Sequence, residues 1–222
     1  MVRKLDRVRG VARVETLLAH DQPGLFAAIG ELDWYSGSHR RWINDQVFRA
    51  GDRVLEVGCA TGALTAYLAD IGCRVTGLDR SDDMIRRGRN DHPDLDLRVG
   101  DATLLPHDND AFDAVVAASV INVVPDARLV LSEMGRVCAP GGTVSVLVPS
   151  TDFSDDDLNA LIVTLRVTGF SEAALSKWHR SAPKMSASQL ESLFRSADLE
   201  PVTTSSYLNG MLQAATATAR SA

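Results

Sequence analysis

The chain has 222 residues, of which 45% are hydrophobic and 23% are charged, and its formal net charge is −6. This length and composition are typical of one soluble domain with a sizeable core. The negative charge argues against a broad nucleic-acid-binding surface, because phosphate contacts need clustered Lys and Arg. No apolar run reaches the roughly 20 residues of a membrane-spanning helix. The N-terminal residues also lack a continuous apolar signal region, so we expect a cytoplasmic protein.

The first 50 residues predict helices. Apolar side chains recur at helical spacing in residues 5–19, and a second short helix is expected at 24–32. The run 34–38 interrupts the pattern, and a helix can resume at 39–48. We interpret residues 1–50 as an N-terminal helical lid that contributes to a substrate site.

Residues 51–222 alternate predicted strands and helices, which is typical of an α/β protein with a doubly wound, mostly parallel sheet. The first five strands are expected at 53–57, 73–78, 96–100, 112–119 and 143–148. The helices between them are expected at 62–71, 81–90 and 126–138. Ser81 and Asp126 stand where helix caps are expected.

Two further strand-like runs, 202–208 and 211–218, are joined by Asn209-Gly210. That dipeptide is the favoured two-residue hairpin turn, because both positions accept positive φ. We therefore expect a seven-stranded sheet that ends in an antiparallel hairpin. The segment 151–185 before it is too long for a plain connection, and we interpret it as a helical lid insertion within one compact domain.

The acidic run 155–157 follows Ser154. Ser154 and Asp157 form a capping arrangement at the start of an apolar helix, which is a simpler interpretation than a metal site. The three cysteines Cys59, Cys73 and Cys138 have no zinc spacing. We therefore predict no metal and expect buried thiols.

The most informative stretch is the strand–turn–helix unit at 54–65. An apolar run ends at Glu56, and Gly58, Ala60 and Gly62 follow in a turn that can open a helix. Small residues let the chain turn tightly and let a ligand approach the main chain. The free N–H groups at the start of the helix then face that ligand.

Three acids each follow or end a predicted strand: Glu56, Asp79 and Asp101. Asp79 lies 21 residues beyond Gly58, near the spacing of about 20 expected for a carboxylate that binds a ribose. Parallel strands would place all three acids at one edge of the sheet, where open α/β sheets bind ligands.

With these segments the chain resembles class I S-adenosylmethionine-dependent methyltransferases. The resemblance covers roughly residues 50–150 and rests on segments that occur in the family's order: the loop at 54–65, Asp79, Gly100-Asp101-Ala102, Leu104-Leu105-Pro106, Phe112–Val116, Leu131–Met134 and Pro140-Gly141-Gly142. It implies a Rossmann-like methyltransferase fold with S-adenosylmethionine as the cofactor. The family's loop usually reads Gly-x-Gly-x-Gly, and here Ala60 occupies the middle position.

The resemblance also implies roles for the cofactor residues. Glu56 would lie near the methionine end, with Gly58, Ala60 and Gly62 framing it. Asp79 would bind the ribose hydroxyls. The adenine would lie against Asp101 and Ala102, and the sulfonium would lie close to Ser119.

The sequence is less specific about the residues that bind the substrate that accepts the methyl group. Trp34, Tyr35 and Trp42 precede the first strand, and Trp178 lies in the 151–185 segment. Aromatic side chains can frame a flat or apolar ligand, although Trp34 and Trp42 could equally be core anchors. Asn122 could orient a substrate, while a turn before Pro125 is the plainer interpretation.

Three residues are candidate general bases. His39 and His179 are suggested by their intrinsic pKa, although a histidine on a helix is more often a surface or satisfied residue. Asp45 could act as a base if it is buried.

We interpret the chain as a transferase, an S-adenosylmethionine-dependent methyltransferase of small-molecule biosynthesis, whose acceptor atom is O, N or C. One alternative is cofactor-independent chemistry on the same fold, such as ring closure, in which Asp45 and Arg166 would matter more. A second alternative is a non-catalytic partner subunit, against which the three acids argue. We expect a small-molecule substrate, no nucleic acid and no membrane, and a homodimer or protein partner stays open.

Overall fold

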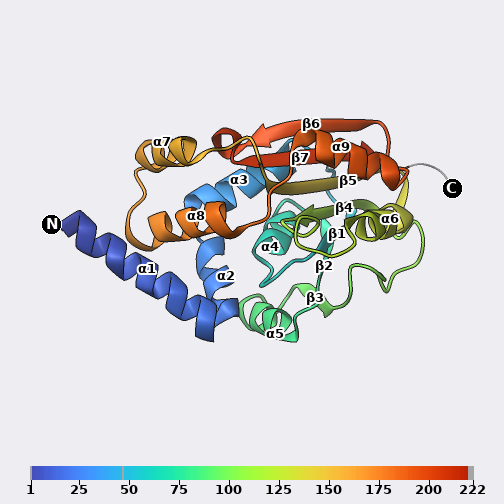
Figure 1. Cartoon of the computed structure of the whole chain (residues 1–222). Helices are drawn as coiled ribbons and strands as arrows, with labels where there is room; N and C mark the ends of the chain where they lie inside the picture. The colour runs from blue at the N-terminus through green and yellow to red at the C-terminus, as the bar shows by residue number, and fades with distance from the viewer. Residues whose placement is uncertain (1, 47, 220–222) are drawn as a thin grey trace.

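The computed structural model of the chain describes residues 2–46 and 48–219. Within them seven strands form one sheet in the order β3-β2-β1-β4-β5-β7-β6, and β7 alone runs against the others (Figure 1). The strands are β1 (Arg53–Val57), β2 (Arg74–Asp79), β3 (Asp96–Val99), β4 (Phe112–Ala118), β5 (Cys138–Pro149), β6 (Val202–Tyr207) and β7 (Leu212–Thr218). The predicted seven-stranded sheet with an antiparallel hairpin is confirmed.

Nine helices are described in the same residues: α1 (Val2–His20), α2 (Gln22–Gly30), α3 (Asp33–Asn44), α4 (Ala63–Asp70), α5 (Asp82–Asp91), α6 (Ala127–Val137), α7 (Asp155–Leu165), α8 (Gly169–Ser181) and α9 (Ala187–Ser196). Ser81 and Asp126 accept backbone N–H groups at the starts of α5 and α6, as predicted. Ser154 and Asp157 form the predicted capping box of α7. No helix in the described part of the chain is both long enough and apolar enough to cross a bilayer.

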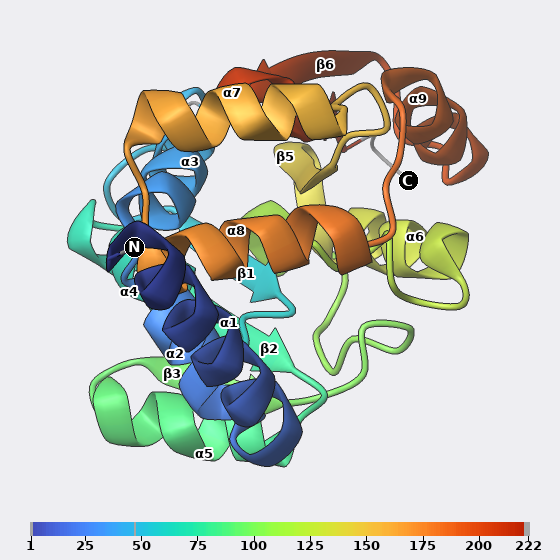
Figure 2. The same ribbon diagram turned by 60° about the vertical axis from the view of Figure 1, so that its left-hand side comes forward.

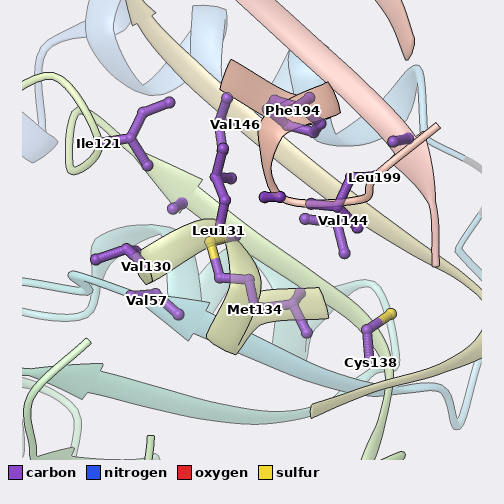
Figure 3. Packing of buried hydrophobic residues seen from close by; sticks show 14 of the residues in the cluster. Val57, Ile121, Val130, Leu131, Met134, Cys138, Val144, Val146, Phe194 and Leu199 are labelled. Atoms are coloured by element: carbon purple, nitrogen blue, oxygen red, sulfur yellow. The ribbon is translucent and has the colours of Figure 1, made fainter. Parts of the chain in front are cut away.

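Two apolar layers cover the sheet. On one face, α6 and α9 bury Leu131, Met134 and Phe194 against Val144 and Val146 of β5 (Figure 3). On the other face, α3 and α4 cover the sheet with residues that include Trp42 and Leu68. Full burial of one large apolar side chain stabilises a fold by about 1.5–3 kcal/mol, so these two layers hold the parallel strands in place.

Helix α3 runs without a break, which corrects the expected interruption at 34–38. Local residue preferences are overridden by packing, because the helix buries Trp34 and Trp42 on its inner side. Trp42 is 0% exposed, and its Nε1 donates a hydrogen bond to Ser145 Oγ of β5 at 3.0 Å. The structure therefore favours the core-anchor interpretation for Trp42 over a substrate contact.

Four helices, α1, α2, α7 and α8, form a further layer that we call the helical cap. Figures 1 and 2 show α8 on the side of the sheet toward which β1 and β4 point, with α1 packed against α8. The backbones approach closely: a Cβ added at Gly10 of α1 would stand 2.2 Å from the carbonyl oxygen of Gly169. An ion pair of Arg7 with Glu172 also joins the two helices. The two predicted lid segments thus pack against each other.

Two connections differ from the sequence prediction. The hairpin turn is longer than two residues, because Tyr207 pairs with Leu212 and a short 3-10 helix, Leu208–Gly210, lies between them. Asn209 and Gly210 still adopt positive φ. Strand β5 begins at Cys138 rather than at residue 143, because Cys138 already pairs with Phe112 of β4; the register then shifts, and regular pairing resumes at Thr143 with Ala114.

Replacing Trp42 with Phe should lower the free energy of unfolding by about 2 kcal/mol, because the change leaves a cavity and removes the bond to Ser145. Urea unfolding followed by circular dichroism measures the loss. Trp178→Phe is the control, since Trp178 is only partly buried and should cost less. An equal loss in both variants would contradict the role of Trp42 as an anchor.

Candidate functional site

The loop between β1 and α4 turns through three left-handed residues. Gly58, Ala60 and Gly62 have φ values of +75°, +48° and +86°. A Cβ added at Gly58 would stand 2.2 Å from Cγ2 of Val120, which follows β4. Gly58 therefore satisfies two demands, a positive φ and the close approach of Val120.

Ala60 occupies a conformation that suits glycine. For a residue with a Cβ, a left-handed conformation costs roughly 1–2 kcal/mol. The backbone N–H of Ala60 donates to Asp79 Oδ2 at 2.9 Å, and the N–H of Ser81 donates to Asp79 Oδ1 at 2.9 Å. The carboxylate of Asp79 therefore joins the loop to the end of β2 and stabilises the strained turn.

Glu56 of β1 is 3% exposed and accepts a hydrogen bond from Thr65 Oγ1 of α4. The pKa of Glu56 is raised to about 7, mainly by burial; the Thr65 bond opposes the rise, and the nearby negative charge of Asp79 adds to it. Burial and the charge of Glu56 raise the pKa of Tyr35 as well, which indicates that α3 reaches the end of β1.

The remaining cofactor candidates lie at the ends of β3 and β4. Asp101 is exposed, and its Oδ1 accepts hydrogen bonds from both the backbone N–H and the hydroxyl of Thr103 at 2.8 Å. These bonds lower the pKa of Asp101. Ala102 is partly buried beside it. Ser119 has a positive φ of +56°, and its N–H donates to the carbonyl oxygen of Leu147 at 2.7 Å.

The structure brings four ring-bearing candidates together. Tyr35 stacks on His39 with 4.1 Å between ring centroids, and Trp178 of α8 lies 5.3 Å from Tyr35 and 6.4 Å from His39. Trp34 lies 5.7 Å from Trp178, and its Nε1 donates to Ser171 Oγ. We call Trp34, Tyr35, His39 and Trp178 the ring cluster. It joins α3 to the helical cap.

Asp45 is separated from these residues. It is exposed at the end of α3 and accepts a hydrogen bond from the hydroxyl of Tyr207 at 2.9 Å. Burial, and after it this hydrogen bond, raises the pKa of Tyr207 to about 12. Tyr207 lies on β6, four strands from β1, or roughly 19 Å at 4.8 Å per strand. Asp45 is a candidate base only if it is buried, and that condition is not met, so its position offers no support for a role as base beside Glu56.

Of the three other candidates, two have partners of their own and the third is exposed. His179 is 3% exposed, with its Nε2 3.2 Å from Asp155 Oδ1, and burial lowers its pKa. Asn122 donates to the carbonyl oxygen of Pro183 at 2.9 Å and so ties the loop after β4 to the segment after α8. Arg166 is exposed at the end of α7 in a left-handed conformation.

Sequence reasoning missed Thr65 and Val120. Thr65 carries a hydroxyl three residues after Gly62, in the first turn of α4, and this position is the signal that could have identified it as a partner of Glu56. Val120 gave no signal, because its contact with Gly58 depends on how β4 lies beside β1.

Comparisons with known proteins agree with this geometry. A model of a methyltransferase domain family matches residues 55–146. A demethylmenaquinone methyltransferase of Renibacterium salmoninarum is 40% identical over 114 residues, which cover 50% of this chain and 48% of that protein. A phosphatidylethanolamine N-methyltransferase of Cereibacter sphaeroides is 38% identical over 140 residues, which cover 53% of this chain and 68% of that protein.

One solved structure extends the match to the whole fold. It is a chain of the complex between the Haloferax volcanii Trm112 methyltransferase activator and a methyltransferase, with a TM-score of 0.70 at 20% identity over 94% of this chain and 98% of that chain. The sheet order, the left-handed loop and the acids at the strand ends define a Rossmann-like α/β protein. With the sequence matches, the chain belongs to the class I S-adenosylmethionine-dependent methyltransferase family. It spans about half the length of the demethylmenaquinone methyltransferase it matches.

Replacing Gly58 with Ala should destabilise the protein by more than about 2 kcal/mol, because strain at positive φ adds to the clash with Val120. Gly141→Ala is the matched control, since its φ is +79° and no atom lies within 4 Å of the added Cβ. The control should show only the conformational cost of roughly 1–2 kcal/mol. Urea midpoints compare the two, and equal losses would contradict close packing at Gly58.

The raised pKa of Glu56 predicts a pH effect on stability. Between pH 4.5, the ordinary value, and about 7, the folded state keeps a proton that the unfolded state releases. The free energy of unfolding therefore falls as the pH rises through this window. The free energy of unfolding of Glu56→Gln, taken relative to that of the wild type, should therefore rise by up to about 3 kcal/mol between pH 4.5 and pH 8.

Unfolding in urea at both pH values measures this gain. Glu133→Gln is the control, because the neighbouring Arg136 lowers the pKa of Glu133 and no gain is expected there. A pH-independent difference between Glu56→Gln and the wild type would contradict a raised pKa at Glu56.

Proposed function

We propose that this chain is an S-adenosylmethionine-dependent methyltransferase that acts on a small molecule. The observation that carries the proposal is the hydrogen bond from the Ala60 N–H to Asp79 Oδ2. It joins the loop between β1 and α4 to the carboxylate that we propose binds the ribose. Family membership supplies the activity class, and the site supplies residues that fit the cofactor.

The carboxylates of Asp79 and Asp101 keep the free hydrogen-bond acceptor positions that binding a nucleoside requires. Each oxygen of Asp79 accepts one backbone N–H, and a carboxylate oxygen has two lone pairs, so Asp79 can still accept from two neighbouring hydroxyls. Among the described residues, both contacts of Asp101 use Oδ1, which leaves Oδ2 for an amino group. Asp79 therefore fits a ribose, and Asp101 fits an adenine.

S-adenosylmethionine supplies an activated methyl group on a cationic sulfur. The protein's part is to bind it beside negative charge and to hold the acceptor in line with the methyl group. Asp79 supplies negative charge near the loop, and Glu56 adds to it to the extent that it is ionised, since burial raises its pKa to about 7. We propose that Ser119, directly after β4, lies close to the sulfonium, as the resemblance to the family implies.

The helical cap is the proposed acceptor-binding part. The cap and α3 together form the ring cluster, and of its members Tyr35 lies close enough to Glu56 of β1 for the charge of Glu56 to raise its pKa, in addition to burial. The relatives are named for a quinone and a phospholipid acceptor. The matches cover only 50% and 53% of this chain, so we assign neither acceptor to it. Ring closure without the cofactor stays the alternative, and binding of S-adenosylmethionine distinguishes the two, because ring closure does not need that compound.

Wild-type protein should bind S-adenosylmethionine and S-adenosylhomocysteine in calorimetric titrations. Asp79→Asn should weaken both by roughly 10- to 100-fold, because charge-assisted bonds to two hydroxyls weaken. Asp113→Asn is the matched control: Asp113 also binds a backbone N–H, that of Arg53, but it lies at the start of β4, at the opposite edge of the sheet. Folded wild-type protein that binds neither compound would refute the proposed function.

A further inference from the structure

His39 has an unsatisfied ring nitrogen in the interior. The side chain is 3% exposed, and its Nε2 is closed to solvent with no hydrogen-bond partner among the described residues. Leaving a buried polar atom unpaired costs about 1–3 kcal/mol. Native proteins rarely keep such an atom without a reason such as a ligand.

The other ring nitrogen decides the chemistry of Nε2. Nδ1 lies 2.8 Å from the carbonyl oxygen of Tyr35, and a carbonyl only accepts, so Nδ1 carries the proton. Burial lowers the pKa of His39 to about 4, although the bond to Tyr35 opposes this, so the ring is neutral at physiological pH. Nε2 is therefore a lone-pair acceptor, and only a donor group can satisfy it.

The surroundings of His39 favour a flat ligand. The Tyr35 ring lies on the His39 ring at 27°, and the Trp178 ring lies at 26° to it. Both flanking side chains remain partly exposed while His39 is buried. Rings of this kind gain from offset stacking with another ring. Because Nε2 is closed, a ligand reaches it by displacing one of these partly exposed rings.

We propose that the ring cluster is the acceptor subsite and that His39 Nε2 accepts a hydrogen bond from the O–H or N–H of a planar ring. This inference rests on the proposed methyltransferase function for calling the ligand a methyl acceptor. The subsite selects for a ring that carries a donor group and against the same ring with that group blocked.

His179 provides an internal comparison. It is as buried as His39, and its Nδ1 is also closed and unpaired among the described residues. Its Nε2 lies 3.2 Å from Oδ1 of the exposed Asp155, and its ring meets that of Phe153 at 74°, so within the described part of the chain no parallel ring faces it. A buried unpaired nitrogen is therefore present at both positions, but ring stacking is present only at His39.

The test measures binding of 2-naphthol, 2-naphthylamine and 2-methoxynaphthalene by calorimetry, with and without S-adenosylhomocysteine. Wild-type protein should bind one of the two donor-bearing rings about tenfold more tightly than the methoxy compound, as one hydrogen bond to a buried acceptor predicts. Which of the two binds more tightly distinguishes a hydroxyl from an amine acceptor.

His39→Asn is the informative variant, because its amide can still donate to the Tyr35 carbonyl while the Nε2 acceptor is removed. The preference for donor-bearing rings should fall to about onefold in His39→Asn and persist in His179→Asn. In the wild type, the ¹⁵N resonance of His39 Nε2 should also shift with the donor-bearing ring and not with the methoxy compound. This shift reports on the contact independently of the stability of either variant.

Equal binding of the donor-bearing and methoxy rings by the wild type would overturn the inference, as would no ring binding at millimolar concentration. A preference that survives in folded His39→Asn would overturn it as well. Titration with S-adenosylmethionine is a separate measurement. If the protein does not bind S-adenosylmethionine but still prefers the donor-bearing rings, only the cofactor assignment is refuted. If it binds S-adenosylmethionine but shows no preference among the rings, only the subsite is refuted.

Discussion

The carboxylate of Asp79 holds together the part of the molecule on which the candidate site depends. It accepts the N–H of the left-handed Ala60 on one oxygen and the N–H of Ser81, the cap of α5, on the other. One side chain thus fixes the loop after β1 relative to the end of β2. Burial is the main cause of the raised pKa of Glu56, and the charge of Asp79 adds to it.

A second constraint is the way two distant segments close over the strand ends. The N-terminal helices and α7–α8 share one apolar cluster, and Trp178 of α8 meets Tyr35 of α3. Neither segment could bury its apolar face alone. Their packing places a neutral histidine, with a free lone pair, beside rings near the end of β1. The sheet positions the cofactor residues, and the cap positions the aromatic ones.

Sequence patterns predicted the elements between 53 and 149 closely, because strand, turn and cap signals there agree with one another. They failed where packing overrides local preference. Helix α3 continues through 34–38 because burial of Trp34 and Trp42 outweighs the unfavourable local run. Asp45 looked like a candidate base from its neighbours in sequence, but it lies beside Tyr207 at the edge strand.

The sequence by itself determined the fold class, the position of the ligand loop and the acids at the strand ends, because strand periodicity and small residues are local properties. Only the tertiary structure decided which of these groups act together. The Val120 contact with Gly58, the pKa of Glu56 and the grouping of His39 with Trp178 depend on segments far apart in the chain. Burial and through-space charge set those properties, and neither is encoded in the spacing of residues along the sequence.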